Sequence, residues 1–147
     1  AQAADGVAVP TSAKQAYVTD FATGQVLLEK NARTPMKPAS MAKIMTIYIA
    51  FSRVSERSLS LEDRFLVSEK AWKMGGSRSF LDVGSSVTLD ELLHGIIIQS
   101  GNDAAVALAE GISGTEANFV AEMNITAQKL GMTNTVFANA TGWPHPR

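Results

Sequence analysis

Ser40 and Lys43 stand three residues apart in the stretch KPASMAKIMT. Positions with this spacing share one face of a helix, so the Lys43 amine could reach the Ser40 hydroxyl and act as its base. A backbone N–H in a first helical turn has no intrahelical partner and could stabilise an oxyanion beside that hydroxyl. The structural alternative is that Ser40 begins a helix while the Lys43 side chain extends to solvent.

This chemistry requires a neutral amine on Lys43. A free lysine titrates near about 10.4, so lowering its pKa to about 7 costs roughly 4 kcal/mol. Burial among apolar side chains or a neighbouring cation can supply that change. Met41, Ile44 and Met45 are the apolar neighbours that the local sequence offers.

A second polar group interrupts two apolar segments in IIIQSGNDAAVALAE. Ser100 and Asn102 lie at this sharp break, where their side chains can project into a cleft. Ser100 could relay a proton, and the Asn102 amide could hydrogen-bond both a peptide-like substrate and the base lysine. The alternative is that these residues cap the second helix, where Ser and Asn are favoured.

The elements that must position these residues follow from the periodicity. Two β-rich runs, 16–21 and 25–30, predict a hairpin that turns at Gly24. A helix is expected from residue 39 or 40 to about Ser55, with an apolar stripe formed by Met41, Ile44, Met45 and Tyr48. Further helices are expected over 88–99, from Asn102 to a stop at Gly111, and from Thr115 to a stop at Gly131.

The segment between the first two long helices has mixed character. FLVS predicts a short extended piece, SEKAWKM a helical turn and GGSRSFLDVGSS a polar loop. Thr88 and Glu91 have the spacing of a capping box for the next helix. Its predicted apolar face consists of Leu89, Leu92, Leu93, Ile96 and Ile97.

Composition excludes several classes of function. The 147 residues carry 13 Lys and Arg against 14 Asp and Glu, so no basic field would recruit nucleic acid. Cysteine is absent, which excludes disulfides and thiolate metal sites, and two histidines alone make a poor metal site. A Ser-His-Asp hydrolase would need His94 or His145, but His94 falls within the apolar helix predicted over 88–99. Neither a membrane-length apolar run nor a signal peptide is evident.

In this order, S-x-x-K followed by S-x-N resembles the penicillin-recognising serine enzymes, whose third motif is K-T-G. The sequence is most similar to the serine-type D-alanyl-D-alanine carboxypeptidases, the low-molecular-mass penicillin-binding proteins. The likeness covers nearly the whole chain from residue 15, through AYVTDFATGQVLLEKNA, PASMAKIMT, LHGIIIQSGNDAAVALAE and MNITAQKLGMTNTVFANATGW. It implies an α/β (α+β) fold of the β-lactamase/transpeptidase type, here its N-terminal hairpin and helical region without the later sheet strands.

The resemblance also implies a role for each motif residue. Ser40 would be the acyl-enzyme nucleophile and Lys43 its general base, Ser100 would pass the proton to the leaving D-alanine, and Asn102 would position the substrate amide. The implied substrate is the peptidoglycan pentapeptide, and β-lactams would acylate Ser40. No cofactor or metal is implied, and the implied location is the periplasm or cell envelope.

One departure from the family pattern is the absence of Lys-Thr-Gly. In the family this motif lies on a later strand that binds the substrate carboxylate and supplies the other oxyanion donor. We therefore expect residues 1–147 to be a partial catalytic domain. Alone it would be weakly active or inactive, and a second chain or the missing C-terminal half could pair with it.

Two alternatives share this fold. A class A β-lactamase needs a downstream glutamate, and no Glu follows Glu122. A non-catalytic protein that binds peptidoglycan or a partner is the other. The loop GGSRSFLDVGSS borders the cleft in the family, which makes it a candidate for substrate contact.

Overall fold

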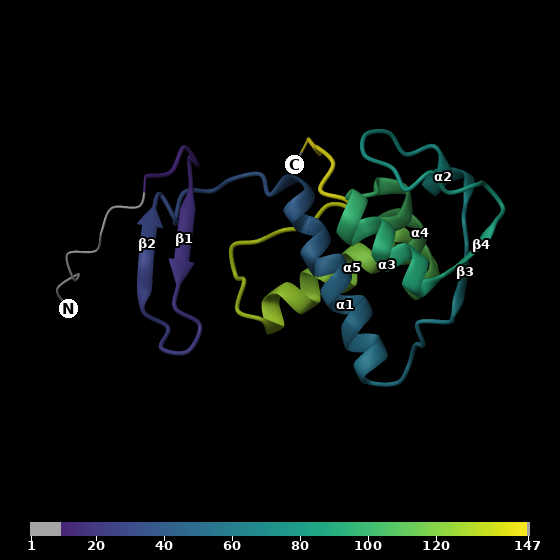
Figure 1. The fold of residues 1–147 in the computed structure, drawn as a ribbon, viewed down its shortest axis with the longest axis horizontal. Helices are drawn as coiled ribbons and strands as arrows, with labels where there is room; N and C mark the ends of the chain where they lie inside the picture. Colours follow the sequence, from purple (N-terminus) through teal and green to yellow (C-terminus); the bar gives the residue numbers. More distant parts are fainter. Residues whose placement is uncertain (1–9, 147) are drawn as a thin grey trace. The chain divides into compact units, whose positions relative to one another are not determined.

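A computed structural model describes residues 10–146 of the chain (Figure 1). The chain divides into two units between Lys37 and Pro38, and each unit is described by itself. The N-terminal unit contains a β-hairpin, and the C-terminal unit contains the long helices.

The hairpin of the N-terminal unit consists of β1 (Ala16–Thr19) and β2 (Val26–Lys30), which pair antiparallel. Asp20 closes its turn, because its backbone oxygen accepts from Gly24 N at 2.9 Å and its carboxylate from Thr23 N at 2.7 Å. Gly24 has φ +71°, a conformation that favours glycine. The predicted hairpin and its turn are confirmed, although β1 ends two residues before the predicted end of the first strand.

The C-terminal unit packs its helices around one buried helix. Its elements are η1 (Ala39–Ala42), α1 (Lys43–Ser55), β3 (Arg64–Leu66), α2 (Glu69–Trp72), β4 (Ser86–Thr88), α3 (Leu89–Gln99), α4 (Asn102–Ser113) and α5 (Glu116–Lys129). Residues 102–109 are all buried, as the nearly continuous apolar run predicts. Helix α4 contacts α1, α2, α3, α5 and β3, so it forms the centre of the core.

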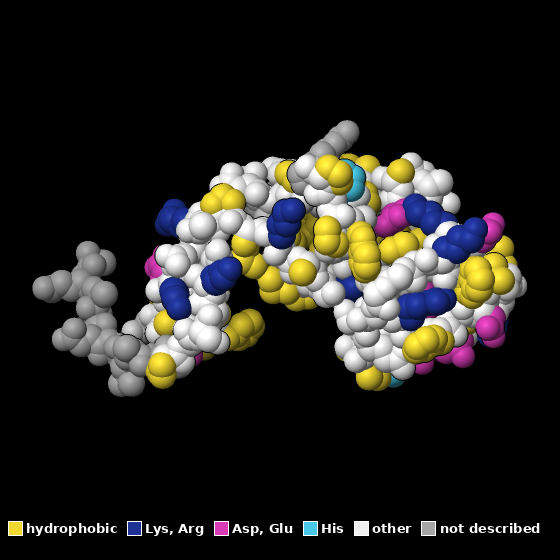
Figure 2. Space-filling view, turned by 90° about the horizontal axis from the view of Figure 1, so that it is seen from above, with side chains coloured by type: hydrophobic (Ala, Val, Ile, Leu, Met, Phe, Trp, Pro, Cys, Tyr) yellow, Lys and Arg dark blue, Asp and Glu magenta, His cyan; other side chains and the backbone are white. Residues whose placement is uncertain are grey.

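Helix α1 packs on a different face from the one the sequence predicts. Met45, Ile49 and Ala50 are buried, whereas Ile44 and Tyr48 are 68% and 45% exposed. The stripe predicted through Ile44 and Tyr48 was therefore wrong as a core face. On the face shown in Figure 2, hydrophobic side chains also reach the surface at several places in this unit.

The following helices begin as predicted, and one ends later. The Thr88–Glu91 capping box at the start of α3 is present, and the hydrogen bonds from Thr88 lower the pKa of Glu91. Helix α4 continues past Gly111, which was predicted as its stop, to Ser113. A Cβ on Gly111 would lie 2.4 Å from the Phe65 ring, so this glycine allows close packing.

Two short strands, β3 and β4, form a second antiparallel pair. Strand β3 and α2 match the predicted extended piece and helical turn, while β4 was not predicted. The polar residues 75–85 form the loop that leads from α2 to β4. This loop is one of the two segments that surround the candidate site.

Candidate active site

The Lys43 amine donates hydrogen bonds to three oxygens from separate segments. Its Nζ lies 3.3 Å from Ser40 Oγ, 2.7 Å from Asn102 Oδ1 and 2.9 Å from the Thr141 backbone oxygen. Residues from η1, α1, α4 and the chain after α5 thus meet at one nitrogen. The predicted association of Ser40 with Lys43, and of Lys43 with Asn102, is present.

Lys43 is buried, with only 3% of its surface exposed. All three of its hydrogen-bond partners are neutral, and no ion pair joins it to a carboxylate among residues 10–146. Burial therefore lowers the pKa of Lys43 below its ordinary value of 10.5, because desolvation disfavours the charged amine. The apolar surroundings come from the packed unit, since Met41 and Ile44 are exposed.

Ser40 lies in the 3₁₀ turn η1 that precedes α1, and it is exposed beside the buried amine. The preceding residue, Ala39, has φ +49°, an uncommon conformation for a residue with a side chain. The 3₁₀ turn and α1 continue directly into one another, which keeps the three-residue spacing of Ser40 and Lys43 on one face. The hydroxyl is therefore accessible while its potential base is not.

Asn102 is the first residue of α4 and is held from two sides. Its side-chain Nδ2 donates to the Gly75 oxygen at 2.8 Å, and its backbone N–H donates to the Ser77 oxygen at 2.8 Å. These bonds leave Oδ1 directed at Lys43. The loop predicted to border the cleft thus contacts Asn102 directly.

Asp103 extends the attachment of that loop. This carboxylate is fully buried, and it accepts from Ser79 N at 2.8 Å, Ala104 N at 2.9 Å and Leu81 N at 3.2 Å. The Arg78 guanidinium lies 4.0 Å away. The sequence analysis did not single out Asp103, although an acidic residue at the start of an otherwise apolar helix is a signal that could have identified it.

Ser100 is the residue that joins α3 to the break before α4. It is the C-cap of α3 and has φ 54°, in the left-handed region. Its side chain makes no hydrogen bond to Ser40 or Lys43 in the described part of the chain, so the structure does not link it directly to the pair. Its suggested proton relay stays a prediction.

The sequence left open that Ser40, Ser100 and Asn102 are helix N-caps and that Lys43 extends to solvent, and the structure shows neither arrangement. Ser40 makes no side-chain cap bond, and the cap residue of α4 is Gly101 rather than Ser100 or Asn102. Lys43 does not extend to solvent. His94 is exposed, and its Nδ1 lies 2.9 Å from the Asp90 backbone oxygen within the same helix.

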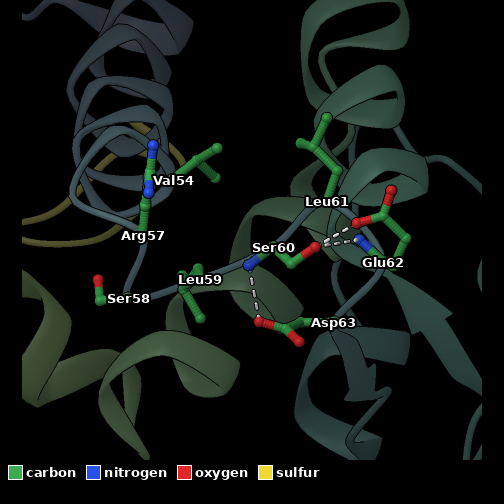
Figure 3. A pocket seen from close by; sticks show the side chains of 8 residues that line it. All are labelled: Val54, Arg57, Ser58, Leu59, Ser60, Leu61, Glu62 and Asp63. Atoms are coloured by element: carbon green, nitrogen blue, oxygen red, sulfur yellow. Dashed lines mark hydrogen bonds between the residues drawn. The ribbon is translucent and has the colours of Figure 1, made fainter.

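Other surface features lie away from this cluster. A hollow of about 580 Å³ lies beyond the C-terminal end of α1. Figure 3 shows the side chains of residues 54 and 57–63, which line it. Across the part that the structure describes, no group of His, Cys, Asp and Glu side chains could hold a metal ion. Within the same residues, no helix is long and apolar enough to cross a membrane.

Thr141 is the partner of Lys43 that the sequence did not reveal. Thr141 contributes its backbone oxygen, which every residue type has, so the amino-acid type at this position could not predict the bond to Lys43. Asn102, by contrast, contributes a side-chain oxygen. The chemistry of its amide predicted a hydrogen bond with the lysine, and the structure confirms the bond to Lys43.

Comparison with known proteins agrees with this architecture. Solved structures that superpose on the chain include the D-alanyl-D-alanine carboxypeptidase DacD from Francisella tularensis, with a TM-score of 0.93 and 38% identity over 100% of this chain and 36% of that one. Penicillin binding protein 5 from Haemophilus influenzae gives a TM-score of 0.89 and 36% identity over 96% of this chain and 42% of that one. The fold is therefore that of the penicillin-binding proteins, of the transpeptidase/β-lactamase-like type.

The family follows from the sequence match. A family model described as D-alanyl-D-alanine carboxypeptidase matches residues 2–147, and the chain belongs to this family. D-alanyl-D-alanine carboxypeptidase DacF of Bacillus subtilis (strain 168) is 46% identical over 130 residues, which are 88% of this chain and 33% of that protein. The chain thus spans about a third of the length of this relative.

Proposed function

We propose that this chain carries the nucleophilic half of a serine D-alanyl-D-alanine carboxypeptidase site. The observation that carries the proposal is the buried Lys43 amine, which bonds Ser40 Oγ and has only neutral partners. A lysine in these surroundings loses its proton more readily than one in water, as a general base must. The family of the chain supplies the reaction class.

In the proposed reaction, Ser40 Oγ attacks the carbonyl carbon of the peptide bond between two terminal D-alanines. The neutral Lys43 amine takes the hydroxyl proton as the Oγ–C bond forms, and the carbonyl oxygen becomes an oxyanion. The C–N bond then breaks as Ser100 gives its hydroxyl proton to the leaving nitrogen and takes the proton held by Lys43, so Lys43 is neutral again and free D-alanine departs. Water hydrolyses the resulting ester and restores the Ser40 hydroxyl.

Asn102 has the substrate-positioning role in this proposal. Its amide can form hydrogen bonds with a peptide group, and its bonds to Gly75 and Lys43 fix its orientation before substrate binds. A β-lactam would acylate Ser40 in place of the peptide, forming an ester that water removes slowly. The proposed partners are therefore peptidoglycan pentapeptides and β-lactams, encountered in the periplasm or cell envelope.

We further propose that residues 1–147 form a partial catalytic domain. The sequence contains no Lys-Thr-Gly, the motif that provides the second oxyanion donor in the family. Loss of one such donor typically slows a reaction by about 100- to 1000-fold. A second chain or a C-terminal half that carries this strand would complete the site.

The test is the intact mass of the chain before and after incubation with a penicillin. We expect an adduct of one penicillin per chain that forms slowly and is absent in Ser40→Ala. Ser52→Ala is the matched control, because Ser52 lies on α1 and its hydroxyl donates to the Tyr48 backbone oxygen. Ser52→Ala should keep the adduct.

The negative outcome is also informative. A folded chain without an adduct would show that these residues do not acylate by themselves. Repeating the measurement on a longer protein that includes a Lys-Thr-Gly strand then decides the assignment of Ser40. Absence of a Ser40 adduct there would contradict the proposed function and favour a non-catalytic binding protein.

A further inference from the structure

The turn formed by residues 139–143 is fixed by hydrogen bonds on several sides. The Ala140 backbone oxygen accepts from Thr46 Oγ1 at 2.8 Å, and its N–H donates to Glu116 Oε1 at 3.1 Å. Glu116 also pairs with Lys70 Nζ at 2.6 Å. Ala140 and Thr141 are buried. A turn held in this way presents its backbone groups in fixed directions.

Asn139 provides the internal bonds of this turn. Its Oδ1 accepts from Gly142 N at 2.7 Å, Thr141 N at 3.2 Å and Thr141 Oγ1 at 3.1 Å. Its Nδ2 donates to the Trp143 oxygen at 2.9 Å. One side chain therefore spans both ends of the turn and determines the orientation of the Thr141 peptide groups.

The turn contacts both members of the proposed catalytic pair. The Thr141 oxygen accepts from Lys43 Nζ at 2.9 Å. Gly142 has φ +76°, and a Cβ there would lie 1.8 Å from the oxygen of Ala39, the residue before Ser40. A displacement of the turn would therefore move the hydrogen-bond acceptor of Lys43 and the backbone next to Ser40.

The geometry of a neutral amine shows why the Thr141 oxygen matters. A neutral lysine has two N–H donors and one lone pair. If Asn102 Oδ1 and the Thr141 oxygen accept the two N–H groups, the lone pair is left to face Ser40 Oγ at 3.3 Å. Without the Thr141 oxygen, an N–H could turn toward Ser40, and that orientation cannot accept its proton.

We propose that Asn139 is a positioning residue, which holds the Thr141 carbonyl so that the Lys43 lone pair faces the Ser40 hydroxyl. This inference rests on the proposed function, in which Lys43 is the base. Asn139 touches neither reacting group itself. It acts through the backbone of residues 141 and 142.

Asn124 offers a matched control. Its side chain also ties the segment after α5 with hydrogen bonds, accepting from Phe137 N at 2.8 Å and donating to the Phe137 oxygen at 2.9 Å and the Val120 oxygen at 3.0 Å. These bonds lie outside the 139–143 turn. Asn124→Ala should therefore lower stability without changing Lys43.

The experiment compares wild type, Asn139→Ala and Asn124→Ala with two readouts on the 147-residue chain. The first is the rate of the Ser40 adduct with penicillin, which we expect to fall about 10- to 100-fold in Asn139→Ala, as small misplacements of reacting groups do. The second is the NMR signal of the two protons on Lys43 Cε. They are inequivalent when the amine is held, and we expect them to merge in Asn139→Ala only.

The two readouts separate the inference from the proposed function. If wild type forms no adduct, these residues do not acylate by themselves and the longer protein decides the proposed function, while the Lys43 signals still decide the role of Asn139. Unchanged Lys43 signals in a folded Asn139→Ala protein, or equal losses in Asn124→Ala, would overturn the inference. If Asn139→Ala does not fold, Asn139→Ser, whose shorter hydroxyl can satisfy fewer of the donors, takes its place under the same criteria.

Discussion

The two ends of α1 each carry a cationic side chain, and the two are used in opposite ways. Lys43 begins the helix, is 3% exposed and donates to three neutral oxygens. Arg53 lies near the other end, and its side chain is 40% exposed and pairs with Glu122 of α5 at 2.5 Å. Burial without an anionic partner lowers the pKa of Lys43, because desolvation disfavours the charged amine. Burial, the neutral partners and a side chain that can lose its proton together distinguish the Lys43 amine from the Arg53 guanidinium.

The two ends of α1 also differ in how far the surrounding chain encloses them. At the Lys43 end, the 139–143 turn and the loop that contacts Asn102 enclose the amine. At the Arg53 end, the chain leaves the helix through a polar segment that lines an open hollow (Figure 3). There Ser60 bonds the Asp63 carboxylate through its backbone N–H at 2.8 Å. The comparison predicts that chemistry is confined to the enclosed end.

The largest effect should come from removing the proposed base, Lys43, at the enclosed end. Lys43→Arg keeps a cation but cannot supply a neutral amine, because arginine stays protonated. We expect the Ser40 adduct with penicillin to form about 100- to 10,000-fold more slowly, the usual contribution of a general base. Arg53→Lys, the reciprocal change at the other end, should leave the rate unaltered. A Lys43→Arg protein that acylates at the wild-type rate would show that Lys43 is not the base.

A smaller effect should appear in the free energy of unfolding, which should depend on pH differently in wild type and in Lys43→Met. The pKa of Lys43 is lowered in the folded state, so below that pKa both states are charged and the folded state bears the full cost of burial. Between the lowered pKa and 10.5 the unfolded chain binds more protons, so wild type gains stability as the pH rises. Lys43→Met lacks this titration.

The measurement is the free energy of unfolding in urea for both proteins across this range. The stability of wild type relative to Lys43→Met should increase with pH, by at most about 1.4 kcal/mol for each pH unit in the window. A constant difference up to about pH 10 would mean that burial does not lower the pKa of Lys43. Arg53→Met should show no such trend.

The smallest effect should come from the exposed pair at the other end. Arg53→Ala removes the ion pair with Glu122, and partly exposed pairs contribute about 0.2–1 kcal/mol. Urea unfolding should show a loss of this size, reduced at high salt, with the acylation rate unchanged. A marked loss of acylation in a folded Arg53→Ala protein would contradict the separation between the two ends.

The sequence predicted those elements whose signals are local. The hairpin is confirmed because its β-rich runs flank Gly24, which adopts the positive φ that the turn needs. The start of α3 is confirmed because Thr88 and Glu91 satisfy each other within one turn. The predicted end of α4 at Gly111 was wrong. This glycine lies within the helix and allows close packing against Phe65, a tertiary contact that no local pattern reveals.

For the site, the candidate residues could be recognised in the sequence, because the side-chain chemistry and order of Ser40, Lys43 and Asn102 suggest a nucleophile, a base and a substrate-binding amide. The folded structure shows that Lys43 is buried, that no carboxylate within residues 10–146 pairs with it and that the Thr141 oxygen is its third partner. The physical reason is that burial and backbone hydrogen bonds depend on which distant segments pack together. Helix periodicity predicted an apolar face for α1 that proved to be exposed at Ile44 and Tyr48, while packing in the folded unit supplied the surroundings that lower the pKa of Lys43.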